Sequence, residues 1–211
     1  MHSRCKIPLK LTDESMANFS KRDATGKLLQ EAAILIIDEV SMGNKLIFET
    51  LDRSLQFVRG NKAPFGGMTM VWATDWRQSL PVVVKGSRGQ IVNSCLKSSY
   101  LWKFAVIYKL EVNMRVFQNS EDREFSDYLL QCGDGLLEIQ ARDGPFKVIV
   151  PSDLAFHGEL DDMINWVFEG LEINCNDHEW TASRSLICPT NKTVDLINNT
   201  LFWLREGLQV T

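Results

Sequence analysis

AILIIDEVSM, residues 33–42, decides the fold of this 211-residue chain. Its aliphatic part is too short to span a membrane and too apolar for a loop. We therefore expect a strand buried on both faces, as in a parallel sheet covered by helices. Two adjacent carboxylates, Asp38 and Glu39, follow the run. Because open α/β sheets bind ligands at the carboxyl ends of their strands, the pair marks a candidate site. The alternative is a strand that ends in an acidic turn.

A second strand is predicted after one helix. Apolar residues at helical spacing span residues 44–59, and Gly60 supplies a helix stop. Residues 68–73 form another buried run, which ends in the polar cluster TDWRQ at residues 74–78. Two strands joined by a helix make a right-handed crossover, with both polar ends on one edge of the sheet. We expect this edge to bring four side chains within reach of one ligand, those of Asp38, Glu39, Asp75 and Gln78.

These residue types suit nucleotide chemistry. In nucleotide hydrolases, the first acid holds Mg²⁺ and the second orients or deprotonates the attacking water. An amide such as that of Gln78 can hydrogen-bond the terminal phosphate, although it can equally cap a turn. Arg115 follows a third predicted strand at residues 105–110, from which an arginine finger can reach a γ-phosphate across a domain interface. The alternative for Arg115 is a surface arginine at a strand end.

Two other segments contain candidate residues for binding nucleic acid. Phe65, beside Gly66-Gly67, is predicted to be a turn-exposed ring that can stack on a base. Thr190 and Asn191 begin a predicted helix, and can either bind a phosphate through free backbone N–H groups or simply cap the helix. Trp102 is predicted to be a core aromatic.

The rest of the chain alternates helices and strands, which indicates α/β layers. Further helices are predicted at residues 25–30, 89–97, 121–131, 159–168 and 191–204. Further strands are predicted at residues 146–150 and 185–188. We place a domain border near residue 116.

Composition narrows the class of protein. Hydrophobic residues make up 45% and charged residues 24% of the chain, which is ordinary for a globular protein. No apolar run reaches the length of a membrane span, so no membrane partner is expected. The five cysteines are scattered and odd in number, which favours buried free thiols over disulfides or a zinc site. The net charge of −4 gives no global basic field, so binding to nucleic acid would need a local groove and stacking aromatics.

Several segments together resemble one family. Residues 36–42 resemble the Walker B segment of superfamily-one DNA helicases. PFGG at residues 64–67, a strand, and TDWRQSLPVV at residues 74–83 are similar to a signature of the PIF-type (petite-integration-frequency) helicases, most closely of the branch carried by Helitron transposons. Further matches follow in family order at residues 2–9, 86–102, 110–115 and 188–198. Their shared order and spacing make the resemblance specific, and it covers nearly the whole chain.

The resemblance implies an α/β fold with RecA-like parallel sheets flanked by helices. Residues 1–116 would be a partial first motor domain, and residues 117–211 a linker and the beginning of a second. The implied activity is that of an ATP-dependent helicase that moves 5′ to 3′ on single-stranded DNA, in recombination, repair and telomere maintenance. The implied location is intracellular, in the nucleus or the mitochondrion. The resemblance does not bear on the oligomeric state.

The resemblance also implies roles for single residues. Asp38 would hold Mg²⁺, and Glu39 would activate the attacking water. Asp75, Gln78 and Arg115 would contact ATP, the last two at its γ-phosphate. The DNA contacts would come from five residues, His2, Ser3, Phe65, Thr190 and Asn191.

The chain also departs from the family. The phosphate-binding loop G-x-x-x-x-G-K-[ST] is absent from the 211 residues. Gly26-Lys27 does not replace it, because Lys21 stands at the first glycine and Leu28 at the hydroxyl. The family's glycine before Asp75 is Thr74, and the family's late motifs are also absent. We therefore expect a fragment or a degraded transposon copy that hydrolyses little or no ATP by itself.

Two other functions compete with the helicase. One is a catalytically inactive remnant that serves as an interaction module. The other is a magnesium-dependent nuclease that uses Asp38, Glu39 and Asp75, although two-metal sites usually need more converging acids.

Overall fold

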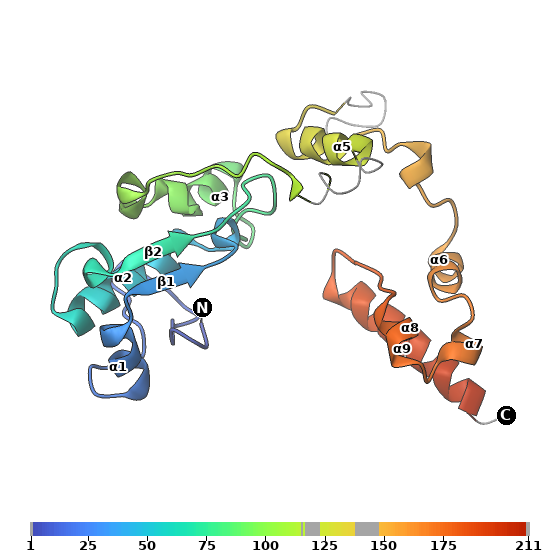
Figure 1. Ribbon diagram of the computed structural model, residues 1–211, viewed down its shortest axis with the longest axis horizontal. Helices are drawn as coiled ribbons and strands as arrows, with labels where there is room; N and C mark the ends of the chain where they lie inside the picture. Colours follow the sequence, from blue (N-terminus) through green and yellow to red (C-terminus); the bar gives the residue numbers. More distant parts are fainter. Residues whose placement is uncertain (1, 115, 117–122, 138–147, 210–211) are drawn as a thin grey trace. The chain divides into compact units, whose positions relative to one another are not determined.

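The computed structural model describes residues 2–114, 116, 123–137 and 148–209 (Figure 1). Contacts divide the chain into two compact units, Met1–Leu137 and Glu138–Thr211. The predicted border near residue 116 concerns the motor domains of the family and stays a prediction. Within the described residues, no helix is both long and apolar enough to cross a membrane.

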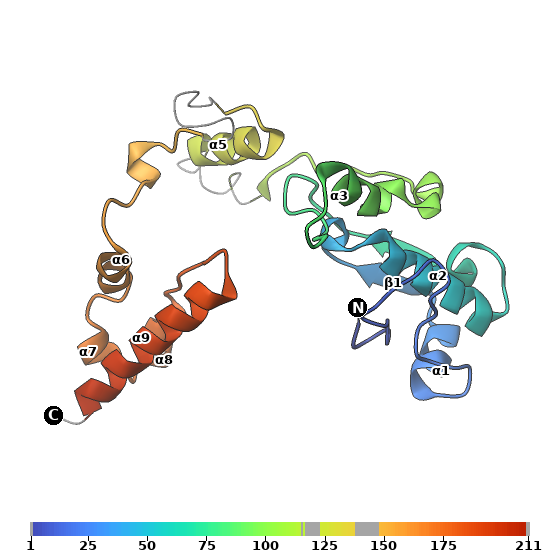
Figure 2. The same ribbon diagram turned by 180° about the vertical axis from the view of Figure 1, so that it is seen from behind.

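The heart of the first unit is a parallel strand pair joined by a helix. Strands β1 (Ile34–Ile37) and β2 (Thr69–Trp72) pair in register from Ile34 with Thr69 to Ile37 with Trp72. Helix α2 (Lys45–Arg59) connects them and lies on one face of the sheet, as Figures 1 and 2 show. The predicted connection of two parallel strands through a helix is confirmed, while its right-handed sense stays a prediction.

Local signals fix both ends of α2. The side chain of Asn44 accepts a hydrogen bond from the Leu46 backbone N–H at 3.0 Å, which satisfies one free donor of the first turn. Gly60 ends the helix in the left-handed conformation, at φ 66°. Between the two caps, Phe48, Leu51 and Leu55 are at most 1% exposed and form the centre of the core.

Shorter elements complete the first unit. Helix α1 (Ala24–Glu31) precedes β1 and packs against α2. The others are the 3₁₀ turns η1 (Val40–Met42), η2 (Pro64–Gly67), η3 (Leu96–Ser98) and η4 (Tyr100–Phe104), with helices α3 (Arg88–Ser94) and α5 (Arg123–Asp134).

The described part of the second unit is helical, apart from an isolated β-bridge at Val148. Its elements are η6 (Ser152–Leu154), α6 (Leu160–Val167), α7 (Leu171–Asn174), α8 (His178–Ala182) and α9 (Asn191–Gln209). Helix α7 packs against α9. Among the residues of this unit whose burial is described, Ile164 and Ile197 are the least exposed apolar side chains, at 2% and 4%.

Two strand predictions are wrong. Residues 105–110 and 185–188 form no strand. The side chains of Val106, Tyr108 and Leu110 are 75%, 88% and 101% exposed. A strand needs a neighbour that pairs with its N–H and C=O groups, and no described residue supplies one for these segments. Residues 146 and 147 of another predicted strand lie outside the described residues, as do residues 121 and 122 of a predicted helix.

The sheet is also buried differently from the prediction. Leu35 and Ile37 point toward the core, and Ile37 is 8% exposed. The alternating side chains of Ile34 and Ile36 are 50% and 66% exposed. Burial on both faces is therefore wrong, because α2 covers one face and no described helix covers the other.

Candidate functional site

The carboxyl edge of the sheet is held together by the backbone beyond the strands. The N–H of Ala73 donates to the Ile37 carbonyl at 2.9 Å, and the N–H of Val40 donates to the Ala73 carbonyl at 3.2 Å. These bonds continue the pairing and place both polar segments at one edge. The prediction that Asp38 and Asp75 follow the same edge of the sheet is confirmed.

Asp38 and Glu39 form a strained, exposed pair of carboxylates. Glu39 adopts the left-handed conformation, at φ 54° and ψ 42°, which is uncommon outside glycine. Its backbone N–H donates to Oδ1 of Asp38 at 2.9 Å. Strain of this kind persists where surrounding structure imposes it, and it concentrates at functional sites.

A buried serine locks this turn to the second strand end. Ser41 is fully buried, and its N–H donates to Oγ1 of Thr74 at 3.1 Å. Its hydroxyl donates to the carbonyl of Asp75 at 3.3 Å. Thr74 stands where the resembled family has glycine, and its hydroxyl gives that departure a structural role.

Asp75 organises the loop that carries Gln78. One carboxylate oxygen accepts from the Arg77 backbone N–H at 3.0 Å, and the other accepts from the Gln78 side-chain amide at 3.4 Å. The N–H of Gln78 donates to the Asp75 carbonyl at 3.2 Å. This geometry matches the turn-capping alternative for Gln78, while the exposed amide remains accessible to a ligand.

The same loop contacts α5 through an ion pair. Nε of Arg77 lies 2.7 Å from Oδ1 of Asp134, and Nη2 lies 3.3 Å from Oδ2. The hydrogen bond to Arg77 lowers the pKa of Asp134, and the same bond raises the pKa of Arg77. The stem of Arg77 fits against Gly133, where a Cβ atom would lie within 3.1 Å of three of its carbons.

Trp76 packs beside the edge. Its ring centroid lies 5.8 Å from that of Trp102, and the Nζ of Lys97 lies 4.3 Å from the Trp76 centroid. Trp102 is partly buried against the core, as predicted.

The prediction of an exposed Phe65 is wrong. Phe65 is 4% exposed, and its ring lies 5.7 Å from that of Trp72. Its φ of 52° turns the side chain inward, and its N–H donates to the buried carboxylate of Asp52. The glycines beside Phe65 therefore serve a tight, inward turn, and stacking of this ring on a base is excluded in this conformation.

The remaining predicted site residues lie elsewhere. His2 is partly buried, with Nδ1 2.9 Å from the Ile7 carbonyl, and Ser3 is exposed. Arg115 lies outside the described residues. Thr190 and Asn191 belong to the second unit, where Oγ1 of Thr190 accepts from the Thr193 N–H at 3.3 Å. That bond supports the capping alternative for Thr190, and a nucleic-acid role for the pair stays a prediction.

The chemistry of the edge can be tested against Mg²⁺. Among the described residues, Oδ2 of Asp38 accepts no hydrogen bond, and nowhere do three His, Cys, Asp or Glu side chains converge on a metal position. Magnesium in nucleotide enzymes usually keeps one or two carboxylates, several waters and substrate phosphates as ligands. The residues therefore fit a Mg²⁺ ion that arrives with a nucleotide.

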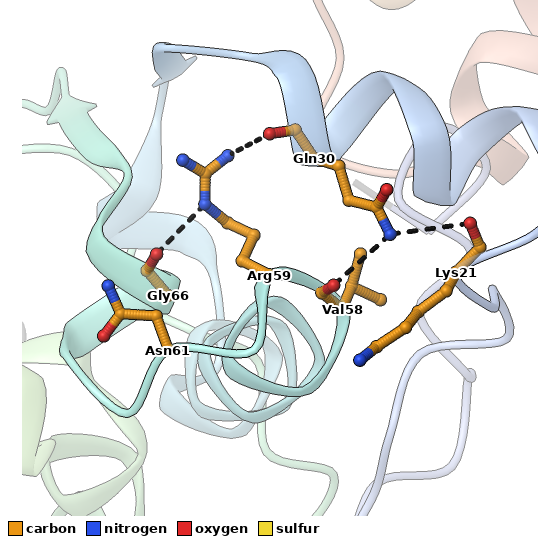
Figure 3. Close-up of a pocket in the computed structure, with 6 residues that line it drawn as sticks. All are labelled: Lys21, Gln30, Val58, Arg59, Asn61 and Gly66. Carbon is orange, nitrogen blue, oxygen red and sulfur yellow. Dashed lines mark hydrogen bonds between the residues drawn. The ribbon is translucent and has the colours of Figure 1, made fainter.

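The amino edge of the sheet is closed by Arg59. Its Nη1 donates to the carbonyls of Leu29, Gln30 and Ala32 at 2.8 to 3.0 Å, and its Nε donates to that of Gly66 at 3.0 Å. Figure 3 shows this guanidinium in an open pocket of about 510 Å³. The pocket lining contains no carboxylate or hydroxyl side chain, so the carboxyl edge remains the candidate catalytic site.

Sequence comparison places the chain in a family. The family model described as PIF1-like helicase matches residues 1–143. The chain belongs to the PIF1-like helicase family. All five of its cysteines are free, but only Cys5 and Cys95 are buried, so the prediction of buried thiols is wrong for the other three.

Two of the curated relatives are ATP-dependent DNA helicases from a bacterium and from human. The Pif1 helicase of Psychrobacter is 39% identical over 92 residues, which cover 43% of this chain and 14% of that protein. Human PIF1 is 38% identical over 78 residues, covering 37% of this chain and 12% of that protein. The chain thus spans a small part of the length of these relatives.

Solved structures confirm the predicted fold class. A double mutant of Bacteroides Pif1 helicase aligns with a TM-score of 0.58 and 20% identity, over 94% of this chain and 42% of that one. Bacteroides Pif1 in complex with ADP-AlF₃ and single-stranded DNA aligns with a TM-score of 0.54 and 23% identity, over 82% of this chain and 43% of that one. The chain is an incomplete α/β, RecA-like structure.

Proposed function

We propose that this chain is part of an ATP-dependent DNA helicase, and that its carboxyl edge takes part in ATP hydrolysis. The observation that carries the proposal is the joined edge, where the Asp38-Glu39 turn is tied to the Asp75–Gln78 loop through Ser41. Family membership supports the reaction class. The related Bacteroides complex contains ADP-AlF₃ and single-stranded DNA, which supports a nucleotide and DNA as ligands.

The two carboxylates have separate roles in this proposal. Asp38 would hold Mg²⁺ through the oxygen that the Glu39 N–H leaves free. Bound Mg²⁺ would neutralise phosphate charge. Glu39 would orient the attacking water and accept its proton.

The loop after β2 would sense the nucleotide. Asp75 holds the Gln78 amide at 3.4 Å, a weak contact that the amide can exchange for a phosphate oxygen. Arg115 would supply positive charge to the γ-phosphate in the transition state. His2, Ser3, Thr190 and Asn191 remain proposed DNA contacts.

The finer features of the helicase are also proposals. They are movement from 5′ to 3′, roles in recombination, repair and telomere maintenance, a nuclear or mitochondrial location, and a Helitron origin. The resemblance of residues 64–67 and 74–83 supports them.

A second candidate is an interaction module without turnover. The observation that favours it is the absence of G-x-x-x-x-G-K-[ST] from the 211 residues. The backbone cradle and lysine of that loop are large contributors to phosphoryl transfer. We therefore expect the 211-residue chain alone to hydrolyse ATP far more slowly than about one per second, the lower end of ordinary enzyme rates. A DNA-stimulated rate of that order, lost in Glu39→Gln, would contradict this expectation.

The catalytic roles can be tested in a chain that joins these residues to a family phosphate-binding loop and second motor domain. Glu39→Gln should abolish hydrolysis and preserve nucleotide binding, because the amide keeps the shape but cannot accept a proton. Arg115→Ala should slow turnover more than it weakens binding. Steady-state ATPase assays and nucleotide titrations provide the measurements, with exposed Glu31→Gln as the matched control. If Glu39→Gln and Glu31→Gln hydrolyse ATP equally well, the assignment of the edge is wrong.

A further inference from the structure

Basic residues are concentrated in one stretch of an otherwise acidic chain. Residues 76–110 contain six of the 23 lysines and arginines and none of the 27 aspartates and glutamates. The whole chain carries a net charge of −4. The stretch is therefore a local positive segment, of the kind that attracts a polyanion even when the whole protein is acidic.

The structure combines this charge with aromatic rings. We name as the η4 strip the five residues Trp76, Lys97, Tyr100, Lys103 and Phe104. Two of its pairs place an ammonium group over a ring. Nζ of Lys97 lies 4.3 Å from the centroid of Trp76, and Nζ of Lys103 lies 4.9 Å from that of Phe104. Tyr100 and Lys103 share one face of η4, because side chains three apart are eclipsed in a 3₁₀ helix.

Tyr100 is held at its hydroxyl while its ring stays accessible. The hydroxyl donates to the buried carboxylate of Asp52 at 2.6 Å, and the side chain is 46% exposed. An anchored ring loses little conformational freedom when a flat ligand stacks on it. Phe104 is 55% exposed and offers a second ring.

Two buried carboxylates contact residues of η4 and the residue before it. Glu49 and Asp52 are 7% and 1% exposed. Glu49 accepts from the Ser99 hydroxyl at 2.6 Å, and Asp52 accepts from the Tyr100 hydroxyl and the Phe65 N–H. These two acids are occupied by neighbouring groups, and the exposed carboxylate of Asp75, next to Trp76, is occupied by the Arg77 N–H and the Gln78 amide.

Exposed rings next to lysines match the needs of single-stranded nucleic acid. Bases stack on aromatic side chains with little sequence preference, while basic residues follow the backbone. Duplex bases are already stacked on each other and offer no free faces. We propose that the η4 strip binds single-stranded DNA, with Lys97 and Lys103 at phosphates and Tyr100 and Phe104 against bases. The choice of DNA rests on the proposed function.

The chain contains a matched control for this strip. Nζ of Lys21 lies 5.1 Å from the ring centroid of Phe57, which is 59% exposed. The Lys21–Phe57 pair thus has the chemistry and exposure of the Lys103–Phe104 pair, but lies on α2 and the segment before α1. The double variants Lys103→Gln/Phe104→Leu and Lys21→Gln/Phe57→Leu change charge and ring content equally.

The experiment measures binding of fluorescein-labelled oligo-dT to the 211-residue chain by anisotropy. We expect Lys103→Gln/Phe104→Leu to weaken binding by about 5- to 150-fold, the range for losing one stacked base, and the control pair to bind like the wild type. We expect Lys97→Gln to lower the slope of log affinity against log salt by about 0.7, the value for one lost phosphate contact on a single strand. Far-UV circular dichroism verifies that each variant is folded.

Three results would overturn the proposal. One is equal binding by the two double variants. Another is an absence of oligo-dT binding by the wild-type chain at low salt. The third is tighter binding of oligo-U RNA than of oligo-dT, which would reassign the strip to RNA. None of these results bears on the Glu39→Gln hydrolysis test, so a failure of the strip and a failure of the proposed ATPase are distinguishable.

Discussion

Helices α2 and α9 begin in similar ways but differ in how they are buried. A side-chain oxygen caps each helix, that of Asn44 for α2 and that of Thr190 for α9. Eight residues of α2 are buried, whereas Ile197 is the buried residue among 191–204 of α9. The comparison shows that caps and periodicity suffice to define a helix, while its stability depends on the partners that cover its apolar face.

The largest expected effect is the loss of a core side chain from α2. Leu51 is 0% exposed, so Leu51→Ala should destabilise the first unit by about 2–5 kcal/mol through lost burial and a cavity. Ile197→Ala in α9 should cost an amount near or below the lower end of that range. Urea denaturation followed by circular dichroism measures both. Equal costs would show that α9 is packed as firmly as α2.

A buried carboxylate of α2 should matter more than an exposed one of α9. Asp52→Asn replaces an acceptor oxygen that faces the Phe65 N–H or the Tyr100 hydroxyl, and should cost about 1–3 kcal/mol. Asp195→Asn, exposed on α9, should change stability by less than about 0.5 kcal/mol. Urea denaturation also measures this pair. If Asp52→Asn leaves the free energy of unfolding unchanged, the hydrogen bonds of Asp52 to Phe65 and Tyr100 do not stabilise the first unit.

The Asp52–Tyr100 contact also predicts a pH dependence. Burial, and then the hydrogen bond to Asp52, raise the pKa of Tyr100 above its ordinary value of 10.0. A folded-state pKa above that of the unfolded chain gives stability that is full below about pH 10 and is lost as the pH rises further. The melting temperature should therefore fall less steeply above pH 10 in Tyr100→Phe than in the wild type. If the melting temperatures of Tyr100→Phe and the wild type fall equally steeply above pH 10, the predicted effect of the Asp52–Tyr100 contact is wrong.

The smallest effect concerns the caps. Asn44→Ala should cost about 1 kcal/mol, because the Leu46 N–H loses its 3.0 Å partner beside the core. Thr190→Ala should cost less, since its bond is 3.3 Å long and the helix end is exposed. Hydrogen exchange of the first-turn amides resolves the difference. If Thr190→Ala increases the exchange rate of its first-turn amides, relative to the wild type, more than Asn44→Ala does, the ranking of the two caps is wrong.

Features set by neighbouring residues were predictable from the sequence. Asn44 and Gly60 bound α2, and two short apolar runs followed by polar residues defined β1, β2 and their common edge. Features set by distant partners were not. The ion pair of Arg77 and Asp134 joins residues 57 positions apart, and no periodicity specifies such a partner.

Two failures have identifiable physical causes. The apolar run at residues 105–110 has the composition of a strand, but composition does not supply the neighbour that a strand needs. Phe65 was expected to be exposed because glycines follow it, whereas its own positive φ turns it inward. Asp52 is the residue from which the inward turn could have been predicted, because an acid on the apolar face of a predicted helix requires a buried hydrogen-bond donor.

The uncovered side of the β1–β2 pair has a practical consequence for handling the protein. Each strand has one free edge among the described residues, and Ile34, Ile36 and Val71 are 50%, 66% and 40% exposed on the open face. Free strand edges beside aliphatic side chains are templates for intermolecular β-pairing and aggregation. The separate chain should therefore self-associate as its concentration rises, and chaperones would recognise the same surface. Ile34→Lys, at the amino end of β1 and therefore at the strand end opposite to the candidate site, would introduce a charge that opposes this association.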